Sequence, residues 1–498
     1  VMANEASPPR NRTRELVFIV LATAVAVQIH PALALIVVWY ILLKALEEYG
    51  VLDRWDATRI LGVVLMVRIK RGQRILETIS RPRAFWRGFG EVGLWTCRFA
   101  SVVVVVLFLL SFILTMLNPS AIEPASASDM LLIPGVSSTI PLGWGLAGLV
   151  IALVIHEYGH GILARAHGMR VRSFGLLIIG LVPIGAFAEP ETDELMRAPS
   201  RERQRVFAAG PAVNIYASFF CFLLMAVLAN QLVAAVPGVH ATGIIEEQPA
   251  AEAGLAPWEI ITHVDGTSMI DYIDMADTLD SHRAGDVIEL TVLSRTDADG
   301  ERTERTFSVT LADQYLYEVE RGTDPEVLEL YGISEGDAFL GVSGLSSNDV
   351  GAQRLAGPLR NDAPSGVRAT VFGFAAQPMT IIYSPLEYKG EIMHPNELEL
   401  LSAGDFPLGT DGLLAVIHLL FWVTWMNVLL GFANLIPLLP FDGGHLLRDR
   451  LHDHLSLLAK VTKWHPMKVK QMANKVSRMS SLVILMMIIA LIVLPMLV

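Results

Sequence analysis

Two histidines and a glutamate lie within five residues of one another, in the motif H-E-Y-G-H at residues 156–160. On a helix, His156 and His160 are four residues apart and project from one face, so both imidazoles can bind one Zn²⁺ ion. Glu157 lies beside them and could take a proton from a metal-bound water. The surrounding apolar stretch, residues 143–166, is long enough to span a bilayer, where ionisable side chains are costly. The pattern therefore predicts an inward-facing zinc centre.

A second polar group follows the apolar stretch at residues 413–439, in the run N-L-I-P-L-L-P-F-D-G-G-H from Asn434 to His445. Prolines and a glycine pair interrupt the helix there, and unwound backbone at membrane depth is tolerated only where it is buried or lines a cavity. A zinc ion held by two histidines lacks a third protein ligand, which Asp442 would supply. We do not expect His445 to be a further ligand.

Hydrophobic residues make up 53% of the 498-residue chain, more than in a soluble globular protein, so we expect a polytopic α-helical membrane protein. The net charge of −12 is unevenly distributed. Residues 236–409 carry 30 acidic and 9 basic side chains, a balance of −21, whereas the remainder carries 20 acidic and 29 basic ones, a balance of +9. An acidic, mostly soluble domain is therefore expected between membrane segments with basic flanks. No nucleic-acid partner is expected.

About six transmembrane helices are expected from apolar stretches that are long enough to cross the bilayer. They cover residues 16–45, 92–117, 143–166, 207–233, 413–439 and 480–498, and the first could be one kinked span or a hairpin of two. Basic loops stay in the cytoplasm, and they lie at residues 68–87, 165–172, 197–205 and 448–478. A multi-pass protein of the cell membrane is thus predicted, with its zinc centre towards the cytoplasmic side and its acidic domain outside.

Three other apolar segments are not expected to cross the membrane. Residues 60–67 are too short, and predict a strand or a segment on the membrane surface. Residues 171–188 contain three glycines and a proline, which favours strands or a re-entrant hairpin. Residues 367–385 are interrupted by Gly373 and Pro378 and could lie at the membrane surface.

The two motifs together resemble those of the site-2 proteases, zinc metalloproteases that cleave substrates within the membrane. The resemblance implies that His156, His160 and Asp442 bind zinc and that Glu157 is the catalytic base. It also implies that Asn434 holds the substrate strand or its carbonyl. Residues 209–214, A-G-P-A-V-N, are similar to the G-P-x-x-N span of that family, and Asn214 could bond to a facing helix or help to shape the site.

Residues 239–295 resemble a PDZ domain, as found between the catalytic spans in one branch of that family. The runs Q-P-A-A-E-A-G-L at 248–255 and I-I-T-H-V-D-G at 260–266 carry the match, although Trp258–Glu259 replaces the usual Gly-Asp. The resemblance implies an α/β domain whose groove strand, near Gly243, Ile244 and Ile245, could bind a peptide or protein tail by strand addition.

These features divide the chain into six expected regions: an N-terminal membrane and basic part (1–91), the first part of the catalytic core (92–235), the PDZ-like domain (236–311), an extension without an assigned role (312–410), the second part of the core (411–451), and a basic loop with the last span (452–498). The function expected is that of a zinc-dependent intramembrane endopeptidase acting on transmembrane protein substrates in the lipid bilayer. The alternatives are a non-catalytic adaptor that binds membrane proteins through the PDZ-like domain, and a metal transporter. The complete set of four residues argues against an adaptor, and a transporter would have inverted repeats, which the sequence does not display.

Overall fold

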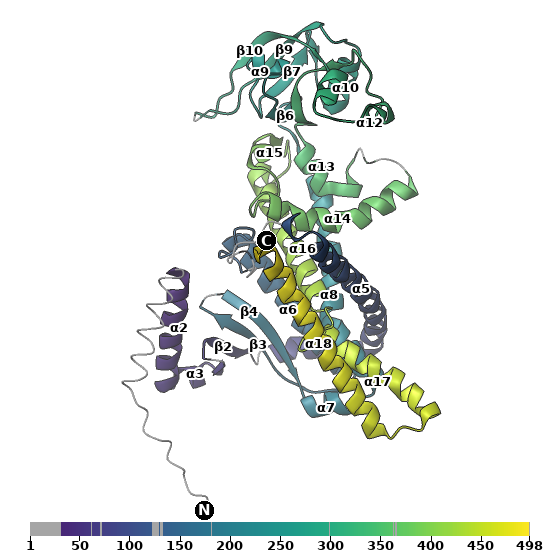
Figure 1. The fold of residues 1–498 in the computed structure, drawn as a ribbon. Coiled ribbons are helices and arrows are strands. Elements are labelled where there is room, and N and C mark those ends of the chain that lie inside the picture. Colours follow the sequence, from purple (N-terminus) through teal and green to yellow (C-terminus); the bar gives the residue numbers. More distant parts are fainter. Residues whose placement is uncertain are drawn as a thin grey trace, which may run out of the picture. The chain divides into compact units, whose positions relative to one another are not determined.

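The computed structural model describes residues 31–60, 62–69, 72–121, 129, 133–180, 182–297, 299–361, 363 and 366–497. The chain divides into two compact units, one of Val1–Phe220 with Trp422–Val498 and the other of Cys221–Phe421. The first contains most of the long helices, and the second combines a sheet with helices (Figure 1). The acidic segment, residues 236–409, lies within the second unit.

Five helices in the described part of the chain are long and apolar enough to cross a membrane. They are α5 (Arg83–Leu117), α6 (Leu142–Ala166), α8 (Ser200–Ala229), α16 (Gly409–Ala433) and α18 (Pro466–Leu497), and each overlaps a predicted span. Apolar side chains along α5 and α18 are exposed, which suits contact with lipid. Residues 16–30 of the remaining predicted span lie outside the described residues, and helix α2 (Pro31–Glu48) covers its end. The chain is a polytopic helical membrane protein.

Small residues let the helices of the first unit approach closely. A Cβ atom built on Gly148 of α6 would lie 2.8 Å from the carbonyl carbon of Trp422 in α16. One built on Gly159 of α6 would lie 2.9 Å from the carbonyl oxygen of Ala209 in α8. Side chains at either position would push the helices apart, so glycine is what permits this packing.

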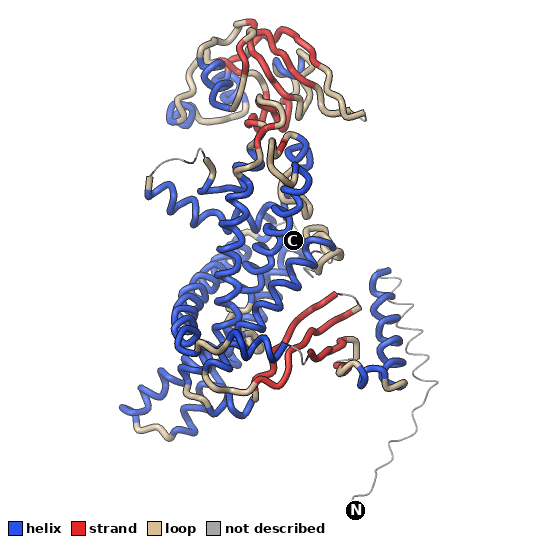
Figure 2. Tube along the Cα trace, turned by 180° about the vertical axis from the view of Figure 1, so that it is seen from behind, coloured by secondary structure: helices blue, strands red, loops and turns tan. Residues whose placement is uncertain are grey.

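Four antiparallel strands form a sheet in the first unit, in the order β1–β2–β3–β4 (Figures 1 and 2). They are β1 (Ala57–Ile60), β2 (Val64–Ile69), β3 (Val171–Ile179) and β4 (Val182–Pro190). Residues 60–67 and 171–188 therefore contribute to strands, as the sequence predicts. β4 is the outer strand and contacts α6, and no described strand pairs with its other edge. A strand edge thus lies beside the helix that carries both histidines.

The second unit contains an antiparallel sheet in the order β10–β9–β7–β6–β13, with β8 (Thr267–Ser268) paired to β7. Its other strands are β6 (Val239–Ile244), β7 (Ile260–Val264), β9 (Val287–Leu293), β10 (Glu304–Thr310) and β13 (Val342–Ser347). Helices α9 (Pro249–Glu252) and α10 (Tyr272–Asp280) accompany the sheet, and Ile261, Ile288 and Leu290 lie in its buried core. This is a PDZ-like fold. Its sheet extends beyond residue 311, because β13 comes from the region expected to be a separate extension.

The remaining elements are short, apart from two helices of 21 residues, α14 (Val367–Glu387) and α17 (Asp442–Thr462). Short helices of the first unit are α3 (Val51–Arg54), α4 (Gly72–Ile79), α7 (Thr192–Arg197) and the 3₁₀ turn η1 (Pro119–Ala121). Those of the second are α11 (Gln314–Glu320), α12 (Pro325–Leu330), α13 (Val350–Ala356), α15 (Pro395–Glu399) and the 3₁₀ turn η3 (Gly357–Leu359). Two small strand pairs complete the second unit: β5 (Val233–Ala234) with β14 (Leu401–Ser402), and β11 (Ala312–Asp313) with β12 (Ala338–Phe339).

Candidate metal centre

Helices α6 and α17 bring three metal-binding side chains together. The Nε2 atoms of His156 and His160 each lie 3.3 Å from Oδ2 of Asp442, and 3.2 Å from one another. One possible ligand atom from each of the three residues falls within 4.8 Å of the others. The sequence places His160 and Asp442 282 positions apart (442 − 160), so the fold is what makes them neighbours.

Asp442 reaches the histidines because the chain turns sharply between α16 and α17. The helix α16 ends at Ala433, and the amide of Gly443 then donates a hydrogen bond of 2.7 Å to the carbonyl of Asn434. A Cβ atom on Gly444 would lie 2.7 Å from the backbone of Leu438, so this return has no room for a side chain. After this turn, α17 begins at Asp442.

The orientation of the His160 ring fits it for metal binding. Its Nδ1 lies 2.7 Å from the carbonyl oxygen of Val206, and since a carbonyl only accepts, Nδ1 carries the hydrogen. The lone pair of the ring is then on Nε2, which faces Asp442. Metal-bound histidines in proteins are commonly held by such a bond on the second nitrogen.

Two imidazole nitrogens and one carboxylate oxygen match the donor set of a catalytic zinc site with one open coordination position. Gly210 of α8 borders the group: a Cβ atom there would lie 2.7 Å from Nε2 of His156, and closer still to Nε2 of His160. The absent side chain leaves the space at the ligand atoms clear. Glu157, half-buried on α6, follows His156 directly, where the motif expects the base.

Side-chain contacts between α17 and the first turns of α8, which the sequence analysis did not predict, hold the two helices together. Arg203 donates from Nε to Oδ2 of Asp449 at 2.9 Å, and the Asp449 side chain is only 4% exposed. The ring of His445 stacks on that of Phe207, with the ring centroids 4.7 Å apart. Further along α17, Asp453 accepts hydrogen bonds from Ser200 and Gln204. These contacts hold the helix that begins with Asp442. The four-residue spacing of His445, Asp449 and Asp453 was the available signal.

The two candidate asparagines differ in their surroundings. Asn434, just after α16, donates from Nδ2 to the carbonyl of Leu430 in the last turn of that helix at 3.0 Å. Its role towards a substrate stays a prediction. Asn214 is fully buried on α8, with its Cβ 3.3 Å from a Cβ built on Gly431 of α16. Neither polar atom of the Asn214 side chain has a hydrogen-bond partner among the residues the structure describes.

The predicted groove strand of the PDZ-like domain is covered by the chain itself. β13 pairs with β6 in the register Val342–Ile244 and Ser343–Gly243, and the amide of Ile245 donates to the carbonyl of Gly341. The expectation of a free edge at Gly243, Ile244 and Ile245 is therefore wrong, because β13, a strand about 100 residues later, occupies it. β13 is itself the outer strand of the sheet and contacts α10.

Comparison with known proteins gives a consistent result. Residues 144–487 match the model of peptidase family M50, and this range includes all four residues expected to act at the zinc centre. An uncharacterized protein of Methanocaldococcus jannaschii is 21% identical over 440 residues, covering 86% of this chain and 88% of that protein. The zinc metalloprotease Rip1 of Mycobacterium bovis is 26% identical over 362 residues, covering 60% of this chain and 82% of that protein.

A solved structure is similar to part of the chain. The PDZ domain of an SdrC-like protein from Listeria monocytogenes covers 22% of this chain and 90% of that chain, at 17% identity and a TM-score of 0.16. At that score the likeness carries no weight, and the PDZ-like character rests on the order of the strands and on the two helices described above.

Proposed function

The chain belongs to peptidase family M50, and from this premise we propose that it is a zinc-dependent endopeptidase that cleaves membrane-anchored proteins in or near their transmembrane segments. The observation that carries the proposal is the cluster formed by His156 and His160, both on the membrane-spanning helix α6, with Asp442. His156 lies ten residues from the C-terminal end of α6 (166 − 156), which corresponds to about 15 Å along the helix. We therefore expect a scissile bond that reaches this cluster to lie within the bilayer.

The residues around the cluster have separate roles in peptide hydrolysis. Bound to the two histidines and Asp442, a zinc ion would lower the pKa of a water molecule and polarise the scissile carbonyl. Glu157 takes the proton of the attacking water and returns it to the leaving amine. The carbonyl of Val206 keeps Nε2 of His160 turned towards Asp442, and Gly210 keeps the approach to the two rings open.

The substrate must offer an extended backbone, because the carbonyl groups of a helix are already hydrogen-bonded. The outer strand β4 beside α6 supplies a partner for such a segment, which would add to the sheet as a further strand. Transmembrane segments interrupted by glycine or proline unwind most easily, so we expect these to be the preferred substrates.

We propose that the PDZ-like domain captures an extended peptide tail at β13, next to α10, instead of at β6. The outer edge of β13 is the one that an added strand would pair with, and the amide of Tyr272 in α10 is tied to Oγ of Ser347 at 2.8 Å. The basic residues after α6 favour a cytoplasmic position for the end of α6 nearest the zinc centre, with the acidic domain outside the cell.

The test is cleavage of single-span substrates by the purified chain in detergent, with the products identified by mass spectrometry. Two substrates of equal length would differ only in a Gly-Pro pair at the middle of the span. We expect zinc-dependent cleavage inside the span, faster for the substrate with the pair. Cleavage confined to soluble loops would leave a metalloprotease but overturn the intramembrane proposal.

A further inference from the structure

Helix α14 exposes a continuous apolar stripe. Its members are between 50% and 81% exposed: Val367, Val371, Met379, Tyr383 and Leu386. Their separations of three, four or eight residues place them on one side of a helix. Such a contiguous exposed stripe on a long helix marks a binding surface more often than a water-facing one.

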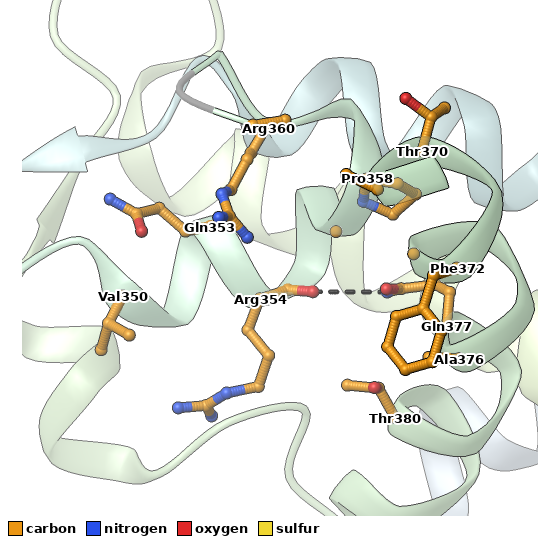
Figure 3. Close-up of a pocket in the computed structure, with 14 residues that line it drawn as sticks. Val350, Gln353, Arg354, Pro358, Arg360, Thr370, Phe372, Ala376, Gln377 and Thr380 are labelled. Carbon is orange, nitrogen blue, oxygen red and sulfur yellow. Dashed lines mark hydrogen bonds between the residues drawn. The ribbon is translucent and has the colours of Figure 1, made fainter. Parts of the chain in front are cut away.

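The opposite side of α14 is packed against its own unit. Ile381 and Ser384 are buried there, and Gln377 donates from Nε2 to the carbonyl of Arg354 at 3.3 Å (Figure 3). Between α13, η3 and α14 lies a cavity of about 490 Å³, which Phe372 and Thr370 help to line. The contacts fix the rotation of α14, so the apolar stripe faces outward as a consequence of how the helix is held.

The end of a membrane-spanning helix anchors this segment. Asn230, just after α8, donates to the carbonyl of Leu359 at 2.9 Å and accepts from the amide of Asn361 at 3.0 Å. The ring of Phe374 in α14 meets that of Phe222 in α8 edge-on at 6.4 Å. Phe222 lies seven residues before the end of α8 at Ala229, about 10 Å along the helix. Interfacial helices bury their apolar face by about 5–10 Å at the boundary of headgroups and acyl chains, so a contact this close to the end of a spanning helix suits one.

The charge of the segment differs from that of its surroundings. Residues 354–389 carry four basic and two acidic side chains, whereas the rest of residues 236–409 carries five basic and 28 acidic ones. The four are Arg354, Arg360, Arg368 and Lys389. Arg354 is paired with Glu397, at 2.9 Å, and Arg360 lines the cavity beside α13. Arg368 and Lys389 are exposed and can approach anionic headgroups. An otherwise acidic domain is thus basic where it joins the membrane helix.

We propose that α14 is an interfacial helix whose apolar stripe lies in one leaflet of the lipid bilayer, with Arg368 and Lys389 near lipid phosphates. The occupant of the stripe is lipid, because Phe374 of the same helix packs against Phe222 near the end of the apolar helix α8 and because the neighbouring charge complements anionic headgroups. The helix fixes the PDZ-like domain to the membrane surface, in addition to the chain connections through α8 and α16. The proposal does not depend on the protease activity.

The experiment measures the surroundings of a spin label on α14 in the 498-residue chain, reconstituted into vesicles of phosphatidylcholine and phosphatidylglycerol. The label is attached to Met379→Cys in a background with Cys97→Ser and Cys221→Ser. The matched control is Leu330→Cys on α12, an apolar side chain of the same unit that is 82% exposed. Val371→Cys is a second position on the stripe if Met379→Cys fails to fold. Collision rates with oxygen, which enriches in lipid, and with a water-soluble nickel chelate are compared.

We expect the label on the stripe to collide several-fold more with oxygen, and several-fold less with nickel, than the label at residue 330. Equal nickel collision rates at the two positions would mean that the stripe faces water, and would overturn the proposal. Protection of the stripe label from both oxygen and nickel would mean that protein covers it, and would also overturn the proposal.

Discussion

Replacing Gly210 by alanine should remove the metal from the site while leaving the helix that carries it intact. The added Cβ would lie 2.7 Å from Nε2 of His156, whereas ordinary contacts begin at 3.4 Å, so the ring must retreat by about 0.7 Å (3.4 − 2.7). Metal sites tolerate deviations of only about 0.2 Å. Since disturbing the groups around the ligands already costs roughly 10–100-fold in affinity, moving the ligands should cost more than about 100-fold. Alanine is favoured over glycine in a helix by ~1 kcal/mol, so α8 itself is not weakened.

The assay is the zinc affinity of the purified Gly210→Ala chain, measured by competition with a chelator, beside its helix content from circular dichroism. Gly143→Ala on α6 is the matched control, because a Cβ there meets no atom within 4 Å. We expect the control to bind zinc as the unmodified chain does. Wild-type zinc affinity in Gly210→Ala would refute the geometry of the site.

Three further predictions concern the side-chain contacts between α8 and α17, the buried His240 of the second unit, and the metal. Arg203→Ala leaves the carboxylate of Asp449 buried without this partner, which should lower the free energy of unfolding by about 3 kcal/mol and weaken zinc binding. Exchanging the pair, as Arg203→Asp with Asp449→Arg, should restore part of the stability, measured by thermal unfolding, and part of the zinc affinity, measured by zinc titration. Burial lowers the pKa of His240, so the unfolded chain binds this proton more readily and stability should fall as the pH drops below about 6.5. His240→Gln should flatten that dependence in melting curves recorded between neutral and acidic pH. Chelating the metal should lower the melting temperature of the unit that holds it, since zinc at 1,000 times its Kd contributes about 4 kcal/mol, and zinc but not magnesium should restore it.

The sequence was sufficient wherever the relevant partners are local. His156 and His160 share a helix, so their spacing alone predicts that their rings meet. Asp442 could be assigned because a broken helix and a missing third ligand left few alternatives, and the resemblance to a family agreed. The edge position of β4 and the joining of β13 to β6 depend on partners far along the chain, which residue patterns do not specify.

Trp258 illustrates how a departure from a motif acquires a physical reason only in the fold. It takes the place of the usual glycine and adopts a positive φ of 70°, which is costly for a side chain other than glycine. Its ring stacks on that of His240, with the centroids 4.9 Å apart, and on that of His394, at 4.3 Å, and this stacking offsets part of the strain. Because His394 lies 136 residues further on (394 − 258), the sequence could show the anomaly but not its compensation.

The central claim is tested most directly by comparing Glu157→Gln with the unmodified chain for both zinc content and cleavage of a single-span substrate. Glutamine keeps the shape of the side chain but cannot take a proton from water. We predict equal zinc content in the two proteins, cleavage within the span by the unmodified chain, and no cleavage by the variant. Cleavage by the variant at the unmodified rate would contradict the role of Glu157, and absence of zinc from both proteins would contradict the metal centre itself.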